Sequence, residues 1–444
     1  MREIDSPGIP IYTWAPDLED GAATQAHNCA RLPVAFHHVA VMADGHQGYG
    51  VPIGAVLALQ DAISPYAVGN DIGCGMALVP TTVPRDDLLA PLPAKRGAGG
   101  RIARDEIMGR VQQVVPSGAE GQRVPAGPSD VDPLLDQAFE AMVEAAGLSG
   151  VRLSTSASPN ASAGRSLTAG DFRRRGRSHL GTLGSGNHFI ELLADPGGCV
   201  WLMLHSGSRG IGGLVCNNFH RMALRHCAEL GWSLPDPGLA WLPMGSGDDR
   251  WERVGACYAR ALDAALEYAR RNRRTMLEAV GGLVEGHFPD SMRWEGIVNI
   301  HHNDATLEEH YGSRVWVHRK GAVKASAGTA TITPGSMGSG TYLGRGRGRP
   351  ESFSSCSHGA GRVLSRGRAR RELSLPSQLE TITRAGGKVF AASTEAVLDE
   401  MPGAYKDLDQ VMANQADLVE PVLRLTPLGT YKGADPPRRG NKGR

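Results

Sequence analysis

Short apolar runs separated by glycine turns fill the chain between residues 34 and 79, a pattern typical of β-strands joined by tight loops. Similar runs return after residue 188 and again after residue 296. Together they predict a body rich in sheet. The expected strands are 51–59, 76–79, 189–193, 200–204, 297–300, 314–318 and 329–333.

Helical periodicity appears between and after these strand-rich blocks. The expected helices are 132–146, 214–230, 249–279 and 406–419. In the third of these, Trp251, Val254 and Tyr258 recur on one face, while arginines occupy the outer positions. We therefore expect that face to belong to the core.

The chain shows no repeat of fixed period and no linker that would divide two independent cores. We expect a mixed α/β (α+β) fold in one large domain, residues 1–433, whose strands present glycine- and histidine-rich loops at one edge. Residues 81–175 are rich in Pro, Gly, Ser and Arg, and we expect a variable peripheral segment there. Residues 434–444 are expected to form a flexible basic tail.

Charge is almost balanced over the 444 residues, with 47 Lys and Arg against 46 Asp and Glu. Such a chain has no overall field that selects an acidic partner, so a nucleic-acid site has to be a local basic patch. Runs of arginine are more often solvated surface than binding sites. The candidates are Arg173, Arg174, Arg175 and Arg177, then Arg270, Arg271, Arg273 and Arg274, and the run from Arg366 to Arg371.

The seven cysteines show no paired short spacing, which argues against a disulfide framework. The N-terminus holds two prolines and acidic residues rather than a basic stretch followed by an apolar one. No later apolar run approaches about 18 residues. We therefore expect a cytoplasmic protein without a membrane segment, in which thiols stay reduced and can bind metals.

Histidine is the residue type that points most clearly to chemistry. Several of the 15 histidines stand beside glycine and other ligand-type residues, where strand-like runs begin or end. One such histidine is more often an ordinary hydrogen-bonded side chain, but six segments of this kind on loops at one sheet edge favour a metal centre. The segments are Asp44-Gly-His46, Asp71-Ile-Gly-Cys74, Asn187-His188, His205-Ser-Gly-Ser208, His301-His302-Asn303-Asp304 and His358-Gly-Ala-Gly-Arg362.

The ligand types limit the metal and its role. Carboxylate favours hard cations such as Mn²⁺ or Mg²⁺, imidazole suits later transition metals, and a thiolate can bridge two ions. Asp71 and Cys74 stand three positions apart in a glycine-rich turn, close enough to share one site. The chain has no Cys-x-x-Cys pair, so an open site with one or two ions that acts on phosphate oxygens fits better than a closed zinc site.

Three glycine-rich stretches could expose backbone N–H groups to an anion. They are residues 184–188, 335–340 and 359–362, and none of them is a Walker loop. Each one alone is more often just a tight turn.

Longer strings of residues around these segments follow one another in a recognisable order from His37 to Gly433. They closely resemble the motifs of the RtcB family of tRNA-splicing and RNA-repair ligases, and only residues 81–175 and the tail are poorly covered. The strings are His37-His38-Val39, Met42-Ala-Asp44-Gly-His46-Gln-Gly-Tyr-Gly50, Gly69-Asn-Asp71-Ile-Gly-Cys74-Gly75, Leu183-Gly-Ser-Gly-Asn187-His188-Phe-Ile-Glu191, His205-Ser-Gly-Ser-Arg209-Gly, His302-Asn303, Arg319-Lys-Gly-Ala322, Pro334-Gly-Ser-Met-Gly338, Ser357-His-Gly-Ala-Gly-Arg362, Ala404-Tyr-Lys-Asp407 and Lys432-Gly433.

The resemblance implies a site with two Mn²⁺ ions. Asp71, Cys74 and His188 would hold one ion. Cys74, His205 and His302 would hold the other, so that the thiolate bridges the two.

It also implies GTP as a cofactor and His358 as the nucleophile that keeps GMP as a phosphoramidate. Arg362 would spread transition-state charge, and Asp44 either orients a metal-bound water or the 5′-hydroxyl, or is a structural residue of its turn. Thr341 stands where a serine is expected and keeps the hydroxyl. The residues implied around the nucleotide are Asn187, Glu191, Ser336, Thr341, His358, Gly359, Arg362 and Lys432.

The activity implied is GTP-dependent joining of RNA 3′-phosphate or 2′,3′-cyclic phosphate ends to 5′-hydroxyl ends, through a guanylylated RNA 3′ end. The partner is then RNA with broken ends, either tRNA or another structured RNA, and splicing and repair both stay open. One alternative is a metal-dependent RNA phosphoesterase without ligation, which has no use for His358, Arg362 and Lys432 around a guanine pocket. Another is a non-catalytic RNA-binding protein, against which the complete set of metal ligands argues.

Overall fold

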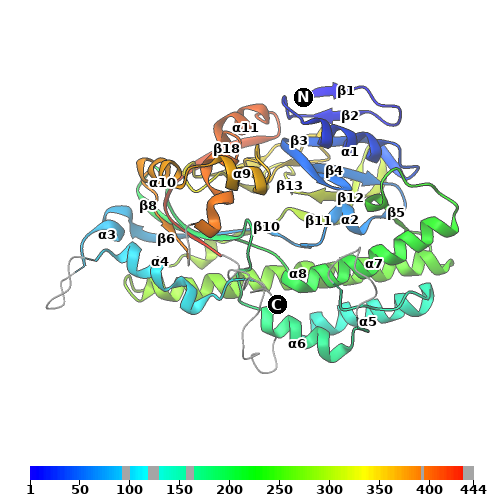
Figure 1. Ribbon diagram of the computed structural model, residues 1–444, viewed down its shortest axis with the longest axis horizontal. Helices are drawn as coiled ribbons and strands as arrows, with labels where there is room; N and C mark the ends of the chain where they lie inside the picture. The colour runs from blue at the N-terminus through cyan, green and yellow to red at the C-terminus, as the bar shows by residue number, and fades with distance from the viewer. Residues whose placement is uncertain (93–100, 119–129, 157–164, 392–394, 434–444) are drawn as a thin grey trace, which may run out of the picture.

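The strand-rich blocks of the sequence form two large sheets, and the computed structural model describes residues 1–92, 101–118, 130–156, 165–391 and 395–433 (Figure 1). Within these residues the first sheet has the order β1-β2-β3-β4-β12-β11. The bounds of its strands, in that order, are Arg2–Ile4, Ile11–Thr13, Ala35–Tyr49, Val51–Leu59, Ser313–Lys320 and Asn303–His310.

The second sheet has the order β10-β6-β8-β7-β18-β15-β14. The short strand β17 also pairs with β18, in parallel. Its strands are Val298–His301, Gly75–Pro84, Cys199–Ser206, Phe189–Ala194, Val419–Lys432, Thr341–Gly346 and Ala330–Pro334 in that order, with β17 at Val389–Phe390. Two short pairs complete the strands described: β13 (Ala322–Lys324) with β16 (Ser355–Ser357), and β5 (Ala62–Ile63) with β9 (Leu242–Pro243). Each strand predicted from the sequence corresponds to one of these strands, and the predictions at 297–300 and 329–333 begin one residue before β10 and β14.

Helices lie on two sides of the sheets. The α-helices described are α1 (Asp20–Ala30), α2 (Pro65–Val68), α3 (Arg85–Leu89), α4 (Ala103–Val114), α5 (Asp132–Ser149), α6 (Ala169–His179), α7 (Arg209–Glu229), α8 (Arg250–Glu285), α9 (Arg366–Glu372), α10 (Leu375–Arg384) and α11 (Leu408–Asn414). Short 3₁₀ turns occupy Pro237–Leu239, Trp294–Gly296, Pro350–Ser352, Glu395–Glu400 and Pro402–Ala404. Figure 1 shows α7 and α8 running beneath the sheets with α5 and α6 beyond them, and α9, α10 and α11 on the opposite side. The predicted mixed α/β fold is confirmed.

The long helix α8 supports both sheets, since it contacts β6, β8 and β10 of one and β11 of the other. It begins at Arg250 because the Asp249 side chain accepts the N–H of Trp251 at 2.7 Å and caps the first turn. Trp251, Val254 and Tyr258 are buried in the largest core cluster, as their spacing predicts. Full burial of each such side chain stabilises the fold by about 1.5–3 kcal/mol.

The stretch 81–175 contains more structure than the single helix predicted there. Its β6 strand continues to Pro84, and α3, α4 and α6 join the predicted α5. Ile107 and Met108 of α4 lie in the core beneath the second sheet, and Leu135 and Met142 of α5 lie in the largest core cluster. Glycine, proline and arginine residues interrupt the apolar spacing of these helices, so the sequence pattern did not predict them. The parts of the stretch at 93–100, 119–129 and 157–164 lie outside the described residues.

The helix predicted at 406–419 is wrong in its extent. The structure has only α11 there, which begins after Asp407 caps the N–H of Gln410. Val419 instead opens β18, where it pairs with Gly346 of β15. Local periodicity cannot anticipate this, because pairing with a strand some 70 positions earlier decides it. The predicted tail, 434–444, lies outside the described residues.

All seven cysteines are free thiols, in agreement with the absence of a disulfide framework. Among the helices described, none combines the length and the apolar character that crossing a bilayer requires.

Candidate active site

The ligand-bearing loops meet at one end of the second sheet. β6 begins at Gly75, which pairs with Ser206 at the end of β8. β7 begins at Phe189 opposite His205, and β10 ends at His301 opposite Gly75. Because these neighbouring strands are antiparallel, the starts of two strands and the ends of two others share one edge. The predicted edge of glycine- and histidine-rich loops is therefore present.

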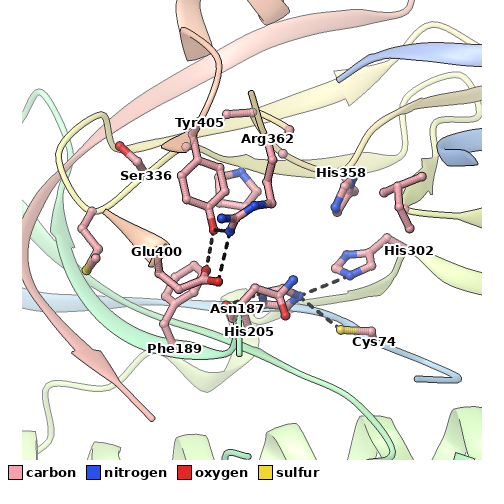
Figure 2. Close-up of a pocket in the computed structure, with 18 of the residues that line it drawn as sticks. Cys74, Asn187, Phe189, His205, His302, Ser336, His358, Arg362, Glu400 and Tyr405 are labelled. Atoms are coloured by element: carbon pink, nitrogen blue, oxygen red, sulfur yellow. Dashed lines mark hydrogen bonds and ion pairs between the residues drawn. The ribbon is translucent and has the colours of Figure 1, made fainter. Parts of the chain in front are cut away.

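Five side chains from these loops form two clusters that could hold metal ions. The ligand atoms of Asp71, Cys74 and His188 lie within 4.8 Å of one another, and so do those of Cys74, His205 and His302. Sγ of Cys74 is 3.2 Å from Nε2 of His205 and 3.5 Å from Nε2 of His188. Nε2 of His205 is also 3.3 Å from Nε2 of His302, and Figure 2 shows these rings grouped around Cys74. The structure thus places together the two ligand sets that the sequence motifs implied.

Two imidazoles are oriented for metal binding by their second nitrogen. Nδ1 of His188 donates to the carbonyl of Leu183 at 2.9 Å, and Nδ1 of His205 donates to the carbonyl of Asn187 at 3.2 Å. A nitrogen that faces a carbonyl carries a ring proton, so Nε2 is the nitrogen of each ring that is left to bind an ion beside Cys74. Hydrogen bonds of this kind fix the tautomer and orientation of metal-binding histidines. The residues present therefore fit a metal centre.

Burial sets the protonation states of this centre. It lowers the pKa values of His205 and His302 well below the ordinary value, so both rings are neutral at pH 7. Burial, reinforced by the charge of Asp71, raises the pKa of the Cys74 thiol well above its ordinary value. Burial also acts to raise the pKa of Asp71, but its hydrogen bond with His188 outweighs this and holds that pKa at about 2. An ion that binds here displaces the thiol proton, so metal affinity should rise with pH.

His358 stands beside these clusters, with its ring centroid 4.8 Å from that of His302. Its Nδ1 lies 2.6 Å from Oδ2 of the fully buried Asp44, and the same oxygen accepts the backbone N–H groups of His358 and Gly359, each at 3.2 Å. Within the described part of the chain, Nε2 of His358 has no hydrogen-bond partner. Asp44 is thus close enough to pair with the imidazole when the ring is protonated, and it is not among the residues that line the cavity.

Glycine is required in the turn that follows His358. Gly361 has φ of 74°, and a Cβ atom there would lie 2.3 Å from the carbonyl oxygen of Asp44. Only a residue without a side chain lets the two backbones approach so closely.

On the other side of His358 the pocket forms a chamber around Glu400, which is 3% exposed. Oε1 of Glu400 accepts from Nη1 of Arg362 at 3.1 Å, and Oε2 accepts from the hydroxyl of Tyr405 at 2.5 Å. Nζ of Lys432, which is also 3% exposed, donates to Oε2 at 3.3 Å. Figure 2 shows Arg362 and Tyr405 reaching toward this carboxylate from above. A buried anion thus holds two cations at the wall of the cavity.

The cavity has a volume of about 300 Å³ and joins the metal clusters to this chamber. Glu191 in its wall accepts from the Thr430 hydroxyl at 2.5 Å, and burial raises the pKa of this carboxyl to about 7. The size lies at the lower end of ligand pockets, which range over about 300–1,000 Å³. Of the residues implied around the nucleotide, those that line the cavity are Asn187, Glu191, Ser336, His358, Gly359, Arg362 and Lys432.

Thr341 does not line this cavity. It is fully buried in β15, and its hydroxyl lies 3.6 Å from the sulfur of Met203. Because successive side chains of a strand point to opposite faces, proximity in sequence to Ser336 does not bring Thr341 to the site.

The three candidate basic patches behave differently. Arg173, Arg174 and Arg177 form ion pairs with neighbouring aspartates, which agrees with a solvated surface. Arg273 does not belong to a patch at all, because its side chain is fully buried. Arg366 lines the cavity and approaches Glu400 to 3.5 Å, with its side chain 53% exposed.

Sequence reasoning did not single out Glu400 or Phe189, although both line the cavity. Glu400 precedes the Ala404-Tyr-Lys-Asp407 string by four positions, and Phe189 lies between two residues that were identified. The sequence feature that could have pointed to Glu400 is a pair of carboxylates, Asp399 and Glu400, between the apolar residues Leu398 and Met401.

Fold and site together define a mixed α/β protein in which one cavity joins a candidate two-ion centre to a buried, charged chamber. The family model described as tRNA-splicing ligase RtcB matches residues 25–433. The chain is 38% identical over 435 residues to the RNA-splicing ligase RtcB of Escherichia coli strain K12, covering 96% of this chain and 97% of that protein. It is 31% identical over 478 residues to the tRNA-splicing ligase RtcB of Pyrobaculum aerophilum, covering 96% and 95%. The chain belongs to the RtcB family of tRNA-splicing ligases, which confirms the resemblance seen in its motifs.

Proposed function

We propose that this protein is a GTP- and manganese-dependent RNA ligase that joins a 3′-phosphate or 2′,3′-cyclic phosphate end to a 5′-hydroxyl end. The observation that carries the proposal is the position of His358 in the cavity shared by the candidate metal clusters and the charged chamber, with Nδ1 2.6 Å from Asp44 and, within the described residues, no hydrogen bond at Nε2. The proposed substrate is a tRNA or other structured RNA with broken ends, as the names of these relatives suggest.

In the first step Nε2 of His358 attacks the α-phosphorus of GTP. An N–P bond forms, the bond from the α-phosphorus to the bridging oxygen breaks, and pyrophosphate leaves. A neutral imidazole is a competent nucleophile at pH 7. The Asp44 carboxylate beside Nδ1 stabilises the positive charge that develops on the ring, as a carboxylate does for a catalytic histidine elsewhere.

The chamber supplies the contacts for the guanylate. An ionised Glu191 can accept the two N–H donors on the Watson–Crick edge of guanine, and Lys432 can donate to O6 or N7. Arg362 offers a planar fork of donors for phosphate oxygens once it is released in part from Glu400. Adenine has an acceptor and an amino group where guanine has a donor and a carbonyl, so the same side chains disfavour ATP.

The guanylate then moves to RNA. A terminal 3′-phosphate oxygen attacks the phosphorus of the His358 adduct, which frees the imidazole and leaves the RNA end joined to GMP through a pyrophosphate link. The 5′-hydroxyl attacks the RNA phosphorus, loses its proton and displaces GMP. A 2′,3′-cyclic phosphate first has to be opened by water to a 3′-phosphate. Guanylylation matters because it gives an unreactive phosphate a good leaving group.

The metal centre fits this chemistry. Asp71, Cys74 and His188 would hold one Mn²⁺ ion, and Cys74, His205 and His302 the other. Bound ions supply Lewis-acid neutralisation of phosphate charge beside His358. With three protein ligands at each cluster, coordination positions remain for phosphate oxygens.

The test is incubation with GTP labelled at the α-phosphorus and Mn²⁺, without RNA, followed by denaturing electrophoresis. We expect an acid-labile, alkali-stable protein adduct that His358→Ala abolishes and that label at the γ-phosphorus does not produce. His27→Ala in α1 is the matched control, since His27 lies outside the cavity and its ring hydrogen-bonds to the backbone of Asp5. Undiminished adduct in His358→Ala would refute the nucleophile. Hydrolysis of a cyclic phosphate end without any adduct would favour the phosphoesterase alternative.

A further inference from the structure

Arg273 of α8 is one of the two fully buried arginines described, and its guanidinium lies within hydrogen-bond distance of four polar groups. Nη1 donates to the carbonyl of Gly73 at 2.6 Å and to that of Ser206 at 2.9 Å. Nη2 lies 3.1 Å from Nδ1 of His301, a nitrogen that is equally close to the carbonyl oxygen of Gly73, and Nε donates to Oδ1 of Asn299 at 2.7 Å. One guanidinium therefore ties α8 to three separate segments of the chain.

Three of these contacts are with residues next in sequence to the ligands of one candidate metal cluster, Cys74, His205 and His302. Gly73, Ser206 and His301 are the immediate neighbours of Cys74, His205 and His302. The guanidinium thus holds each of the three ligand-bearing segments of that cluster at the residue next to its ligand. Among the contacts of Arg273 described here, none is with a residue directly next to Asp71 or His188.

The preceding residue of α8, Asn272, contacts the segment that leads to His188 of the other cluster. Oδ1 of Asn272 accepts the N–H of Gly181 at 2.8 Å, and Nδ2 donates to the carbonyl of Gly207 at 3.0 Å. The segment anchored at Gly181 leads to Leu183, whose carbonyl orients His188. Adjacent positions of one helix therefore support different parts of the metal centre.

The interactions of Arg273 are not those of an ordinary buried ion pair. Within the described residues no carboxylate forms an ion pair with it, and its contacts are carbonyls, an amide and an imidazole. Burial lowers the pKa of the guanidinium to about 10, so the group stays charged at pH 7. A well-packed apolar side chain is often as stable as a buried charge or more so. What an apolar side chain lacks is a rigid fork of donors that can hold several acceptors at fixed positions.

We infer that Arg273 is a positioning residue that shapes the ion site formed by Cys74, His205 and His302, and that it acts much less on the site formed by Asp71, Cys74 and His188. The inference rests on the two-ion centre of the proposed function. It adds that different residues position the ligands of the two ion sites. It also assigns to Arg273 a role that an arginine of a basic surface patch would not have.

The experiment measures metal binding in proteins that retain one site each. His188→Gln leaves the Cys74, His205 and His302 site, and His302→Gln leaves the other site. Each background is prepared with and without Arg273→Lys, stripped of metal, and titrated with Mn²⁺ while the free ion is followed by electron paramagnetic resonance. Co²⁺ titration in parallel reports thiolate ligation through its charge-transfer absorption.

We expect Arg273→Lys to weaken Mn²⁺ binding by about 10–100-fold in the His188→Gln background, the range for loss of a residue that orients metal ligands. In the His302→Gln background the change should be about twofold or less, because Cys74 is then the one remaining ligand that stands next to a contact of Arg273 in the described chain. The Co²⁺ thiolate absorption should weaken only in the first background. Arg271→Lys is the matched control, since it makes the same exchange two positions earlier on the exposed face, where Arg271 pairs with Glu267.

Equal weakening in both backgrounds would overturn the inference in favour of a general structural role, and so would no weakening in either. If Arg273→Lys does not fold, His301→Leu, which removes one contact and keeps the arginine, has to show the same selectivity, and its failure to do so would also overturn the inference. Absence of Mn²⁺ binding in the unmodified protein is a different result, because it counts against the metal centre of the proposed function.

Discussion

Replacement of Glu191 by glutamine should make the protein more stable at alkaline pH and leave it almost unchanged at acid pH. Glu191 is 3% exposed, and burial raises the pKa of its carboxyl from the ordinary 4.5 to about 7. The folded state therefore binds this proton more tightly than the unfolded state does. The stability that the protonated carboxyl contributes is fully present below pH 4.5, is lost as pH rises toward 7, and changes no further above that.

The magnitude follows from the size of this pKa difference. At about 1.4 kcal/mol for each pKa unit, ionisation of Glu191 in the folded state costs about 3 kcal/mol. Glutamine cannot ionise, and its Oε1 can still accept from the Thr430 hydroxyl that Glu191 contacts. Glu191→Gln should accordingly exceed the unmodified protein by up to about 3 kcal/mol in free energy of unfolding at pH 8, and by less than about 1 kcal/mol at pH 5.

The assay is urea unfolding of metal-free, nucleotide-free protein at pH 5, 6, 7 and 8, followed by tryptophan fluorescence. Differences between the two proteins are compared at each pH, because other groups titrate in both alike. Glu295→Gln is the control, since it makes the same exchange at an exposed carboxyl.

Curves for Glu191→Gln and the unmodified protein that stay parallel from pH 5 to pH 8 would refute this reasoning. They would mean that the cavity solvates the carboxylate as well as water does. The expected result would also mean that the proposed guanine contact has a cost in stability. The ionised carboxylate lowers the stability of the fold, but it is the form that can accept both N–H groups of guanine.

The other predictions concern the nucleophile, the chamber and the metals. Asp44→Asn should keep the fold, because an amide oxygen can still accept the backbone N–H groups, but it should slow GMP transfer to His358 by about 10²–10⁴-fold in a single-turnover assay with labelled GTP. Glu400→Gln should lower the free energy of unfolding by about 3–5 kcal/mol in urea, because it leaves buried cations such as Lys432 without their anion. Lys432→Ala should weaken guanylylation by about 1.5–3 kcal/mol and relax the preference for GTP over ATP, and equal use of both nucleotides by the unmodified protein would contradict it. In a metal series on chelated protein, Mn²⁺ should support adduct formation and joining, Mg²⁺ alone little, and trace Zn²⁺ should inhibit; full activity of Cys74→Ala with Mg²⁺ would show that the thiolate is not a ligand.

Much of the fold could be predicted from the sequence because it depends on local spacing. The apolar positions of α8 recur at helical intervals, and the runs that became β4, β7 and β8 are continuous and bounded by glycine or polar residues. The predictions failed where distant pairing outweighs local pattern. Val419 follows a helical stretch but belongs to β18, because β15 offers it a strand partner at Gly346. Thr341 has suitable chemistry, but the pleat of β15 turns it away from the cavity.

The sequence by itself determined which kinds of group are available and in what order, and its family resemblance implied the two ligand sets that the structure brings together as candidate metal clusters. Only the tertiary structure decided what each group faces. Asp44 meets the backbone of His358 across 314 positions of chain, and Arg273 reaches Gly73 across 200. From sequence spacing Arg273 belongs to a surface run, yet it is buried, because the helix turns that one position of the run toward the sheet edge. Such roles are set by the register of antiparallel strands and the path of one long helix, and contacts of this range leave no periodic trace in the sequence.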